Sequence, residues 1–484
     1  MTHAFLGWAA LVAMLAAPSF AQDGVISKQY DDGSVYEGTF KDGRQHGTGT
    51  YTLPNGYSYT GDWVDGEIRG IGTATFPNGS VYVGNFVAGK PEGRGKITYS
   101  DSRTYEGDWA AGRMAGEGVA TYTDGSTYTG SFVDAVHSGK GVITNADGYR
   151  YDGDWVAGEK HGKGKVTYPD GATYDGDLVK GQRQGVGTLT MPDGLTYTGT
   201  WADGQINGTG TLTQPNGDIY EGDFVNGERV GKGRIAYGSG DRYVGDFLGD
   251  KRHGKGVFNG PEGYVYDGEW VDGHIAGNGT VTYPDGSVYS GAFKDDQPNG
   301  IGKITYPDGS SYNGAWVAGV IEGNGRATYA NGQVYEGDFV GAQYEGKGVI
   351  SYPDGYRYEG DWKAGLRDGE GVATYADGST YTGSFVAGQR QGKGEVVMAD
   401  GFRYVGEWKA GVIDGIGVAT YANGDSYDGG FVAGKRQGQG ILRYATGQET
   451  AGEWTNGILT GPAPAAVADT PAEGADPAVA PAGN

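Results

Sequence analysis

Residues 151–171 read YDGDWVAGEKHGKGKVTYPDG, and this stretch contains the pattern that decides the fold. Tyr151, Gly153 and Trp155 are two residues apart, so on a β-strand their side chains point to one face. Gly164 and Val166 are spaced in the same way in the second half. The residues between them are polar or charged and suit a face in contact with water. This alternation predicts two antiparallel strands with one apolar face.

Glycine-containing pairs mark the two connections of this unit. Asp170-Gly171 and Asn55-Gly56 reach the positive-φ conformations that tight turns require. The opposite connection, from Val156 to Lys160, contains its own glycine. We therefore expect each unit to be a β-hairpin.

The hairpin pattern repeats with a constant period of 23 residues. A nineteenth, degraded copy begins at Thr450, where the Tyr is lost but Gly452 and the aromatic Trp454 are kept. The Tyr of each Tyr-x-Gly triplet occupies positions 36, 59, 82, 105, 128, 151, 174, 197, 220, 243, 266, 289, 312, 335, 358, 381, 404 and 427. No insertion interrupts the series, so the chain is an array of stacked repeats.

The common frame of the copies is Tyr-x-Gly-x-(Phe/Trp)-x-x-Gly-x-x-x-Gly-x-Gly, followed by a Thr/Tyr-rich stretch that mostly ends in Asp-Gly or Asn-Gly. Leu178 replaces the Phe in one copy. This frame resembles the MORN (membrane occupation and recognition nexus) repeat family over residues 24–461. In that family the repeats are often linked to phospholipid and membrane association, and in some proteins they accompany a lipid-kinase domain. The resemblance implies phospholipid association as one function of this chain; the repeats leave no room for a kinase domain.

The expected fold class is all-β: an elongated single-layer antiparallel β-meander of about nineteen 23-residue hairpin repeats, shaped as a twisted rod. With about 38 strands at roughly 4.8 Å each, the rod would be about 180 Å long. Rings that cover strand glycines let a single layer bury surface without a second sheet. The expected ladder of rings includes Tyr36, Phe40, Tyr59, Trp63, Tyr151, Trp155, Tyr358 and Trp362.

The sequence predicts four segments. Residues 1–21 contain an apolar run and a small-x-small cleavage site typical of a signal peptide, which predicts a periplasmic or secreted protein. Residues 22–35 match half a repeat and are expected to cap the array of residues 36–461. Residues 462–484 are rich in Ala and Pro and are expected to be disordered. Retention of the first segment as an anchor is the alternative.

Composition argues against catalysis and against anionic ligands. The net charge of -23 disfavours nucleic acid, and the chain contains no Cys. His46, His161 and His253 share one repeat position but lie several repeats apart, so no metal site is expected. Glycine triplets recur in phase with the repeat and are not followed by a helix, which indicates structure rather than a phosphate loop. We expect no catalytic, cofactor or metal site, and therefore no enzyme.

A second period pairs the repeats. Trp and Phe alternate four residues after the Tyr, and five residues further on the side chain is often Ile after Trp and Arg after Phe or Leu. Either the array grew by duplicating pairs, or this row is an interaction edge for a partner with acidic and apolar groups. The row comprises Ile68, Ile206, Ile275, Ile321 and Ile413, with Arg183, Arg229, Arg252, Arg390 and Arg436.

Acidic residues form another row, three residues after the repeat Tyr. Columns of carboxylates could bind divalent cations weakly, although a solvated face is the simpler interpretation. The row includes Asp62, Asp108, Asp154, Asp223, Asp338 and Asp361.

The function favoured by these observations is a non-catalytic scaffold that presents long faces to an unidentified protein or to the cell envelope. Phospholipid association is the first alternative, and carbohydrate or cell-wall binding through exposed rings is the second. Pairing of two chains by their half-covered aromatic faces would give a homodimer, which stays open.

Overall fold

The computed structural model describes residues 24–462, so the expected signal peptide and residues 463–484 of the expected tail lie outside the described residues. The predicted fold class is confirmed: the described residues form an open antiparallel β-meander of 39 strands. One short 3-10 helix, η1, spans Pro261–Gly263. Residues 24–462 contain no helix long and apolar enough to cross a bilayer.

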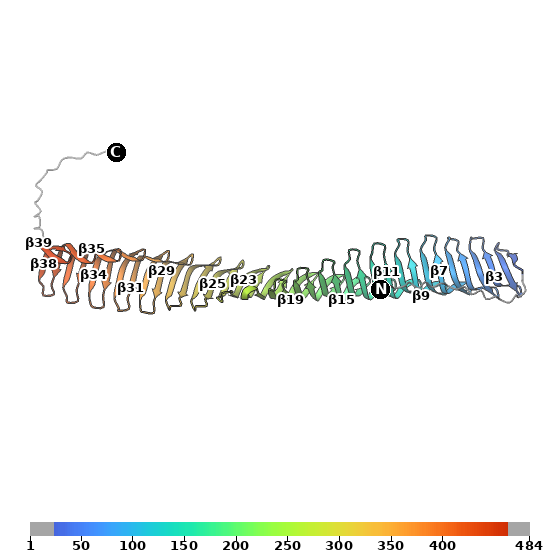
Figure 1. Cartoon of the computed structure of the whole chain (residues 1–484), viewed down its shortest axis with the longest axis horizontal. Coiled ribbons are helices and arrows are strands. Elements are labelled where there is room, and N and C mark those ends of the chain that lie inside the picture. The colour runs from blue at the N-terminus through green and yellow to red at the C-terminus, as the bar shows by residue number, and fades with distance from the viewer. Residues whose placement is uncertain (1–23, 463–484) are drawn as a thin grey trace, which may run out of the picture. The chain divides into compact units, whose positions relative to one another are not determined.

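The chain divides into two units, residues 1–238 and 239–484. Within each unit the hairpins follow one another in chain order (Figure 1). The strands of the first unit are β1 Ile26–Gln29, β2 Val35–Lys41, β3 Arg44–Thr52, β4 Ser58–Val64, β5 Glu67–Thr75, β6 Val81–Val87, β7 Lys90–Thr98, β8 Thr104–Ala110, β9 Arg113–Thr121, β10 Thr127–Val133, β11 Val136–Thr144, β12 Arg150–Val156, β13 Glu159–Thr167, β14 Thr173–Val179, β15 Gln182–Thr190, β16 Thr196–Ala202, β17 Gln205–Thr213, β18 Ile219–Val225 and β19 Glu228–Ala236.

The second unit repeats the same arrangement. Its strands are β20 Arg242–Leu248, β21 Lys251–Asn259, β22 Val265–Val271, β23 His274–Thr282, β24 Val288–Lys294, β25 Gln297–Thr305, β26 Ser311–Val317, β27 Val320–Thr328, β28 Val334–Val340, β29 Gln343–Ser351, β30 Arg357–Lys363, β31 Leu366–Thr374, β32 Thr380–Val386, β33 Gln389–Val397, β34 Arg403–Lys409, β35 Val412–Thr420, β36 Ser426–Val432, β37 Lys435–Arg443, β38 Glu449–Thr455 and β39 Ile458–Pro462.

From β2 to β37, each hairpin joins a seven-residue first strand to a nine-residue second strand, as in β12 and β13. Tyr151 pairs with Val166 and Gly153 with Gly164, but the register shifts before Trp155 pairs with Lys160. The longer strand therefore forms a β-bulge, which bends the hairpin and increases its local twist.

The two connections are tight for different reasons. Between repeats, the Asp170 carboxylate accepts the N–H of Ala172 at 2.9 Å, and Gly171 has a φ of +91°. Inside the hairpin, Ala157 and Gly158 both have positive φ, of +50° and +85°. Two successive positive-φ residues form the turn whose twist matches that of antiparallel strands.

A tyrosine ring lies across the paired glycines of every complete repeat. The Tyr151 side chain has no exposed surface, and a Cβ added at Gly164 would come within 2.3 Å of its ring. The Tyr151 hydroxyl donates to the Asp154 carbonyl at 2.6 Å. Burial is the main cause that raises the pKa of this hydroxyl above its ordinary value. Only glycine leaves room for this contact, which is why glycine stands at the centre of both strands.

The rings pack edge to face along each unit. Trp155 contacts Tyr151 of its own repeat and Tyr128 of the preceding one, both at 5.3 Å between ring centroids. Its indole N–H donates to the Gly141 carbonyl at 3.0 Å. Of the expected ladder, Phe40 is half-buried, and the remaining members are buried: Tyr36, Tyr59, Trp63, Tyr151, Trp155, Tyr358 and Trp362.

We predict that Gly164→Ala destabilises its hairpin by about 1–3 kcal/mol, because the new methyl group and the Tyr151 ring cannot both fit. Hydrogen exchange should accelerate in β12–β15 and remain unchanged in β30–β33, since repeats stabilise mainly their neighbours. Gly24→Ala is the control, because its added Cβ meets no atom within 4 Å. Unchanged protection in β12–β15 would contradict the proposed role of the ring.

Candidate functional site

The predicted row of isoleucines and arginines lies on the aromatic face of the sheet. Each Ile pairs directly opposite a Trp, as Ile206 does with Trp201. Ile275 is buried, and Ile68, Ile206, Ile321 and Ile413 are half-buried. These side chains fill the space beside the indole rings.

Four of the five arginines of the row lie over the Trp ring of the following repeat. The Arg183 guanidinium carbon lies 4.2 Å from the centre of the Trp201 ring, and the group donates to the Gly204 carbonyl at 3.0 Å. Arg252 and Arg436 make the same pair of contacts with Trp270 and Trp454. Cation–π contacts of this kind stabilise by about 0.5–2 kcal/mol. These guanidinium groups therefore help to hold successive repeats together.

Arg390 and Arg229 differ from the other three. Arg390 lies 4.8 Å from the Trp408 ring centre and donates to the Tyr375 hydroxyl at 3.0 Å. Arg229 lies 5.5 Å from the Tyr220 ring centre.

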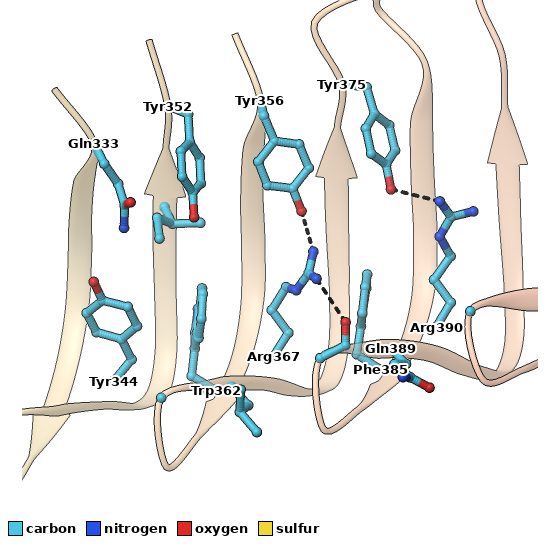
Figure 2. Close-up of a pocket in the computed structure, with 15 residues that line it drawn as sticks. Gln333, Tyr344, Tyr352, Tyr356, Trp362, Arg367, Tyr375, Phe385, Gln389 and Arg390 are labelled. Atoms are coloured by element: carbon cyan, nitrogen blue, oxygen red, sulfur yellow. Dashed lines mark hydrogen bonds between the residues drawn. The ribbon is translucent and has the colours of Figure 1, made fainter. Parts of the chain in front are cut away.

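The second unit contains a groove of about 580 Å³ on its aromatic face, around β29–β33. Figure 2 shows Tyr352, Tyr356 and Tyr375 along one side, with the guanidinium groups of Arg367 and Arg390 pointing toward them. Arg367 donates to the Tyr356 hydroxyl and, at 2.8 Å, to the Gly388 carbonyl. All five side chains are half-buried. The groove thus combines aromatic surface with fixed positive charge.

Sequence reasoning found Arg390 but missed Arg367 and the three tyrosines of the groove. Arg367 comes five residues after Trp362, where the alternation predicts Ile. Arg367 and Arg390 therefore occupy successive positions of the row. The break in the alternation is the signal that could have identified this region. The tyrosines belong to the turns between repeats, where the repeat pattern gives little indication of which way a ring points.

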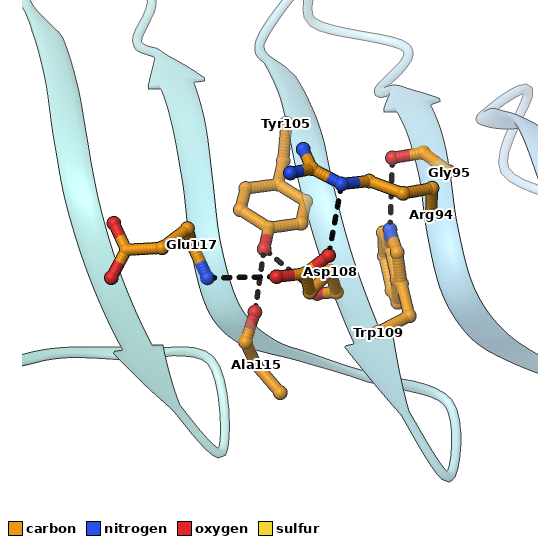
Figure 3. A network of polar contacts seen from close by, with 7 residues as sticks. All are labelled: Arg94, Gly95, Tyr105, Asp108, Trp109, Ala115 and Glu117. Carbon is orange, nitrogen blue, oxygen red and sulfur yellow. Dashed lines mark hydrogen bonds and ion pairs between the residues drawn. The ribbon is translucent and has the colours of Figure 1, made fainter.

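The acidic row lies beside the β-bulges on the opposite face. The Asp108 carboxylate accepts the backbone N–H of Glu117 and the Nε–H of Arg94, each at 3.0 Å (Figure 3). The bulge removes that N–H from the ladder of the hairpin, and the carboxylate binds it instead. Asp154 and Asp361 accept equivalent N–H groups and pair with Lys140 and Lys347.

The other predicted acidic residues differ from these three in their hydrogen-bond partners. Asp62 accepts the N–H of Ile71 at 2.9 Å, and Asp338 accepts from the Asn324 side chain at 3.2 Å. Asp223 lies at a register shift of β18 like the others. Among residues 24–462 no group of three His, Asp or Glu side chains is arranged to hold a metal ion.

The fold and these contacts define a class: a repeat protein built from one open layer of β-hairpins. The MORN repeat model matches residues 36–56, 59–81, 82–102, 105–127, 128–148, 151–173, 174–196, 197–219, 220–242, 243–263, 266–288, 289–311, 312–334, 335–355, 358–380, 381–403, 404–426 and 427–449. The chain belongs to the MORN-repeat family. Its structure is accordingly a repeat scaffold.

Other comparisons give only distant similarities. No curated protein matches the chain. The TCP domain of SAS-4 from Drosophila melanogaster, solved with a proline-rich motif of Ana2, is 16% identical, with 41% of this chain and 88% of that chain covered and a TM-score of 0.20. The TCP10 domain of CPAP from Danio rerio is 17% identical, with 51% and 94% covered and a TM-score of 0.17.

A third similar structure is a catalytically inactive virginiamycin B lyase from Staphylococcus aureus with quinupristin. It is 10% identical, with 67% of this chain and 90% of that chain covered and a TM-score of 0.11. At TM-scores this low, none of the three supports a statement about function.

We predict that acid weakens the array through the aspartates beside the bulges. The Lys140 ammonium bonded to Asp154, and the Lys347 ammonium bonded to Asp361, hold the pKa of each carboxyl below its ordinary 3.8. A carboxyl with a lowered pKa stabilises the fold fully above about pH 4, and the effect is lost as pH falls through the folded pKa. Each exposed pair should contribute about 0.2–1 kcal/mol.

Denaturant unfolding from pH 7 to 2 measures this dependence. Asp154→Asn with Asp361→Asn should lower stability at pH 7 and flatten the decline in acid. Asp175→Asn, at an exposed residue of β14 outside the bulge, is the control. If the double variant and the unmodified chain lose stability in parallel as the pH falls, Asp154 and Asp361 do not cause the acid sensitivity.

Proposed function

We propose that this protein is a non-catalytic scaffold that binds a protein or cell-envelope partner through the groove of Tyr352, Tyr356, Tyr375, Arg367 and Arg390. The main support for this proposal is that the guanidinium groups of Arg367 and Arg390, in successive repeats, contact half-buried tyrosine side chains. A guanidinium has five N–H donors, and one of those of Arg390 donates to Tyr375. Others remain to bind carbonyl or carboxylate oxygens of a partner.

The chemistry of the groove favours an extended polypeptide segment. Tyrosine rings offer flat apolar surface with a polar edge, and arginine adds charged donors; both residue types dominate protein-binding hot spots. The ladder rings proper are less suited to binding, because Tyr151, Trp155 and their equivalents are buried in the sheet. This burial also weakens the carbohydrate alternative, which needs exposed rings.

Phospholipid association is the alternative, and it is supported by the family. A net charge of -23 opposes anionic vesicles, and three arginines of the row already bind Trp rings and backbone carbonyls. We also propose that the chain is exported after loss of residues 1–21; mass measurement of the mature protein should then give Gln22 as the first residue.

We predict that Arg367→Ser with Arg390→Ser weakens partner binding about tenfold or more, as expected for arginine hot spots. The measurement is co-sedimentation of the purified full chain with envelope fractions, followed by titration of the captured protein. Arg436→Ser is the matched control, because Arg436 occupies the same repeat position outside the groove. Equal binding by the double variant and the control would refute the groove as the site.

A parallel salt series with anionic vesicles tests the alternative function. We expect the chain to stay in the supernatant at every salt concentration. Salt-sensitive pelleting with protein-free vesicles would instead support phospholipid association.

A further inference from the structure

The groove around β29–β33 contains positive charge that no acidic side chain neutralises. The sequence has 60 Asp and Glu residues, yet none of those in residues 24–462 lines the groove. Within the same described range, every hydrogen bond of the Arg367 and Arg390 guanidinium groups goes to a neutral oxygen. Arg367 bonds to the Tyr356 hydroxyl and the Gly388 carbonyl, and Arg390 bonds to the Tyr375 hydroxyl. Both groups therefore have donors left for the carboxylates of a partner.

The two arginines are one repeat apart, and this sets a distance along the groove. Arg367 lies in β31 and Arg390 in β33, at the same position of successive repeats. Tyr352 and Tyr375 are also one repeat apart. Equivalent residues are separated by two strand spacings of roughly 4.8 Å, so each charge and each ring recurs about every 9.6 Å across the strands.

The tyrosines of the groove form one continuous wall. The centre of the Tyr356 ring lies 5.5 Å from that of Tyr352 and 5.4 Å from that of Tyr375. In Figure 2 the three rings line one side of the groove, and the two guanidinium groups point toward them from the other side. A segment lying along this wall would contact flat rings and charged donors at the same time.

Among the regular backbones, polyproline II matches this distance most closely. It has three residues per turn and rises about 3.1 Å per residue, so every third residue returns to the same side after about 9.3 Å. A β-strand returns a side chain to the same side every two residues, after about 6.7 Å. An α-helix does so after about 5.4 Å for one turn and about 10.8 Å for two. A polyproline II segment can therefore stay in register with two successive repeats.

We infer that the groove binds a polyproline II segment with two acidic residues three positions apart, lying across strands β29–β33. The inference rests on the proposed function, because it takes the groove as the binding site and names the chemistry of the partner. One carboxylate bonds to Arg367 and the other to Arg390. The prolines of the segment pack on the rings of Tyr352, Tyr356 and Tyr375.

Proline suits this surface for two further reasons. Polyproline II has no internal hydrogen bonds, so its carbonyl groups can accept the arginine N–H groups that the carboxylates leave over. A proline-rich segment is also largely ordered before it binds, so docking on an aromatic wall costs less conformational entropy than for a flexible chain.

Fluorescence anisotropy of labelled proline peptides, titrated with the full chain, tests the inference. Three peptides carry two glutamates in an otherwise all-proline sequence, placed two, three or four positions apart. The peptide with the three-residue spacing should bind at least about tenfold more tightly than the other two, because both of its carboxylates reach an arginine. A version of that peptide with Gln in place of both glutamates should lose at least the same factor.

Arg367→Ile tests the register without disturbing the repeat, because Ile stands opposite Trp at this position elsewhere, as Ile206 does with Trp201. The variant should bind the three peptides equally, since only one arginine of the pair remains. Arg436→Ile, the same change outside the groove, is the matched control and should keep the preference for the three-residue spacing. An unchanged preference in Arg367→Ile would contradict the assignment of the two carboxylates.

The outcomes separate this inference from the proposed function. Equal binding of the three peptides by the unmodified chain, or equal binding of the Gln version, would overturn the polyproline II register. If capture of an envelope partner still fell in the variant Arg367→Ser with Arg390→Ser, the groove would remain the binding site and the chemistry assigned to its partner would be wrong. If neither peptide binding nor partner capture depended on these arginines, both proposals would be overturned.

Discussion

The tyrosine ring that lies on the backbone of two paired glycines is the contact on which the rest of this structure depends. A single-layer sheet has no second layer to cover its apolar face, so each repeat must bury its own aromatic surface. Tyr151 does so because Gly153 and Gly164 let the ring approach the strands themselves. Burial of one such side chain contributes about 1.5–3 kcal/mol, and edge-to-face packing adds about 0.5–1.5 kcal/mol. The next repeat supplies the second ring contact, and stability therefore accumulates along the array.

The same contact determines which residues remain for function. The rings of Tyr151 and Trp155 are buried in the sheet and are not available to a partner. Arg183 and Arg252 contact indole rings and backbone carbonyl groups. Side chains that the ladder does not require lie at the turns and where the alternation breaks. Arg367, Arg390 and the turn tyrosines beside them are such residues, which is why the groove forms there.

The sequence alone determined the hairpin, its period, its apolar face and the role of the glycines, because these depend on residues within one 23-residue copy. It also placed Ile206 and Arg183 in one row. Only the tertiary structure decided what those side chains do. Arg183 binds Trp201, which belongs to the next copy, and Asp108 binds an N–H that a bulge has freed. Such contacts depend on the register between strands and on the direction of each side chain, and local spacing does not encode either of them.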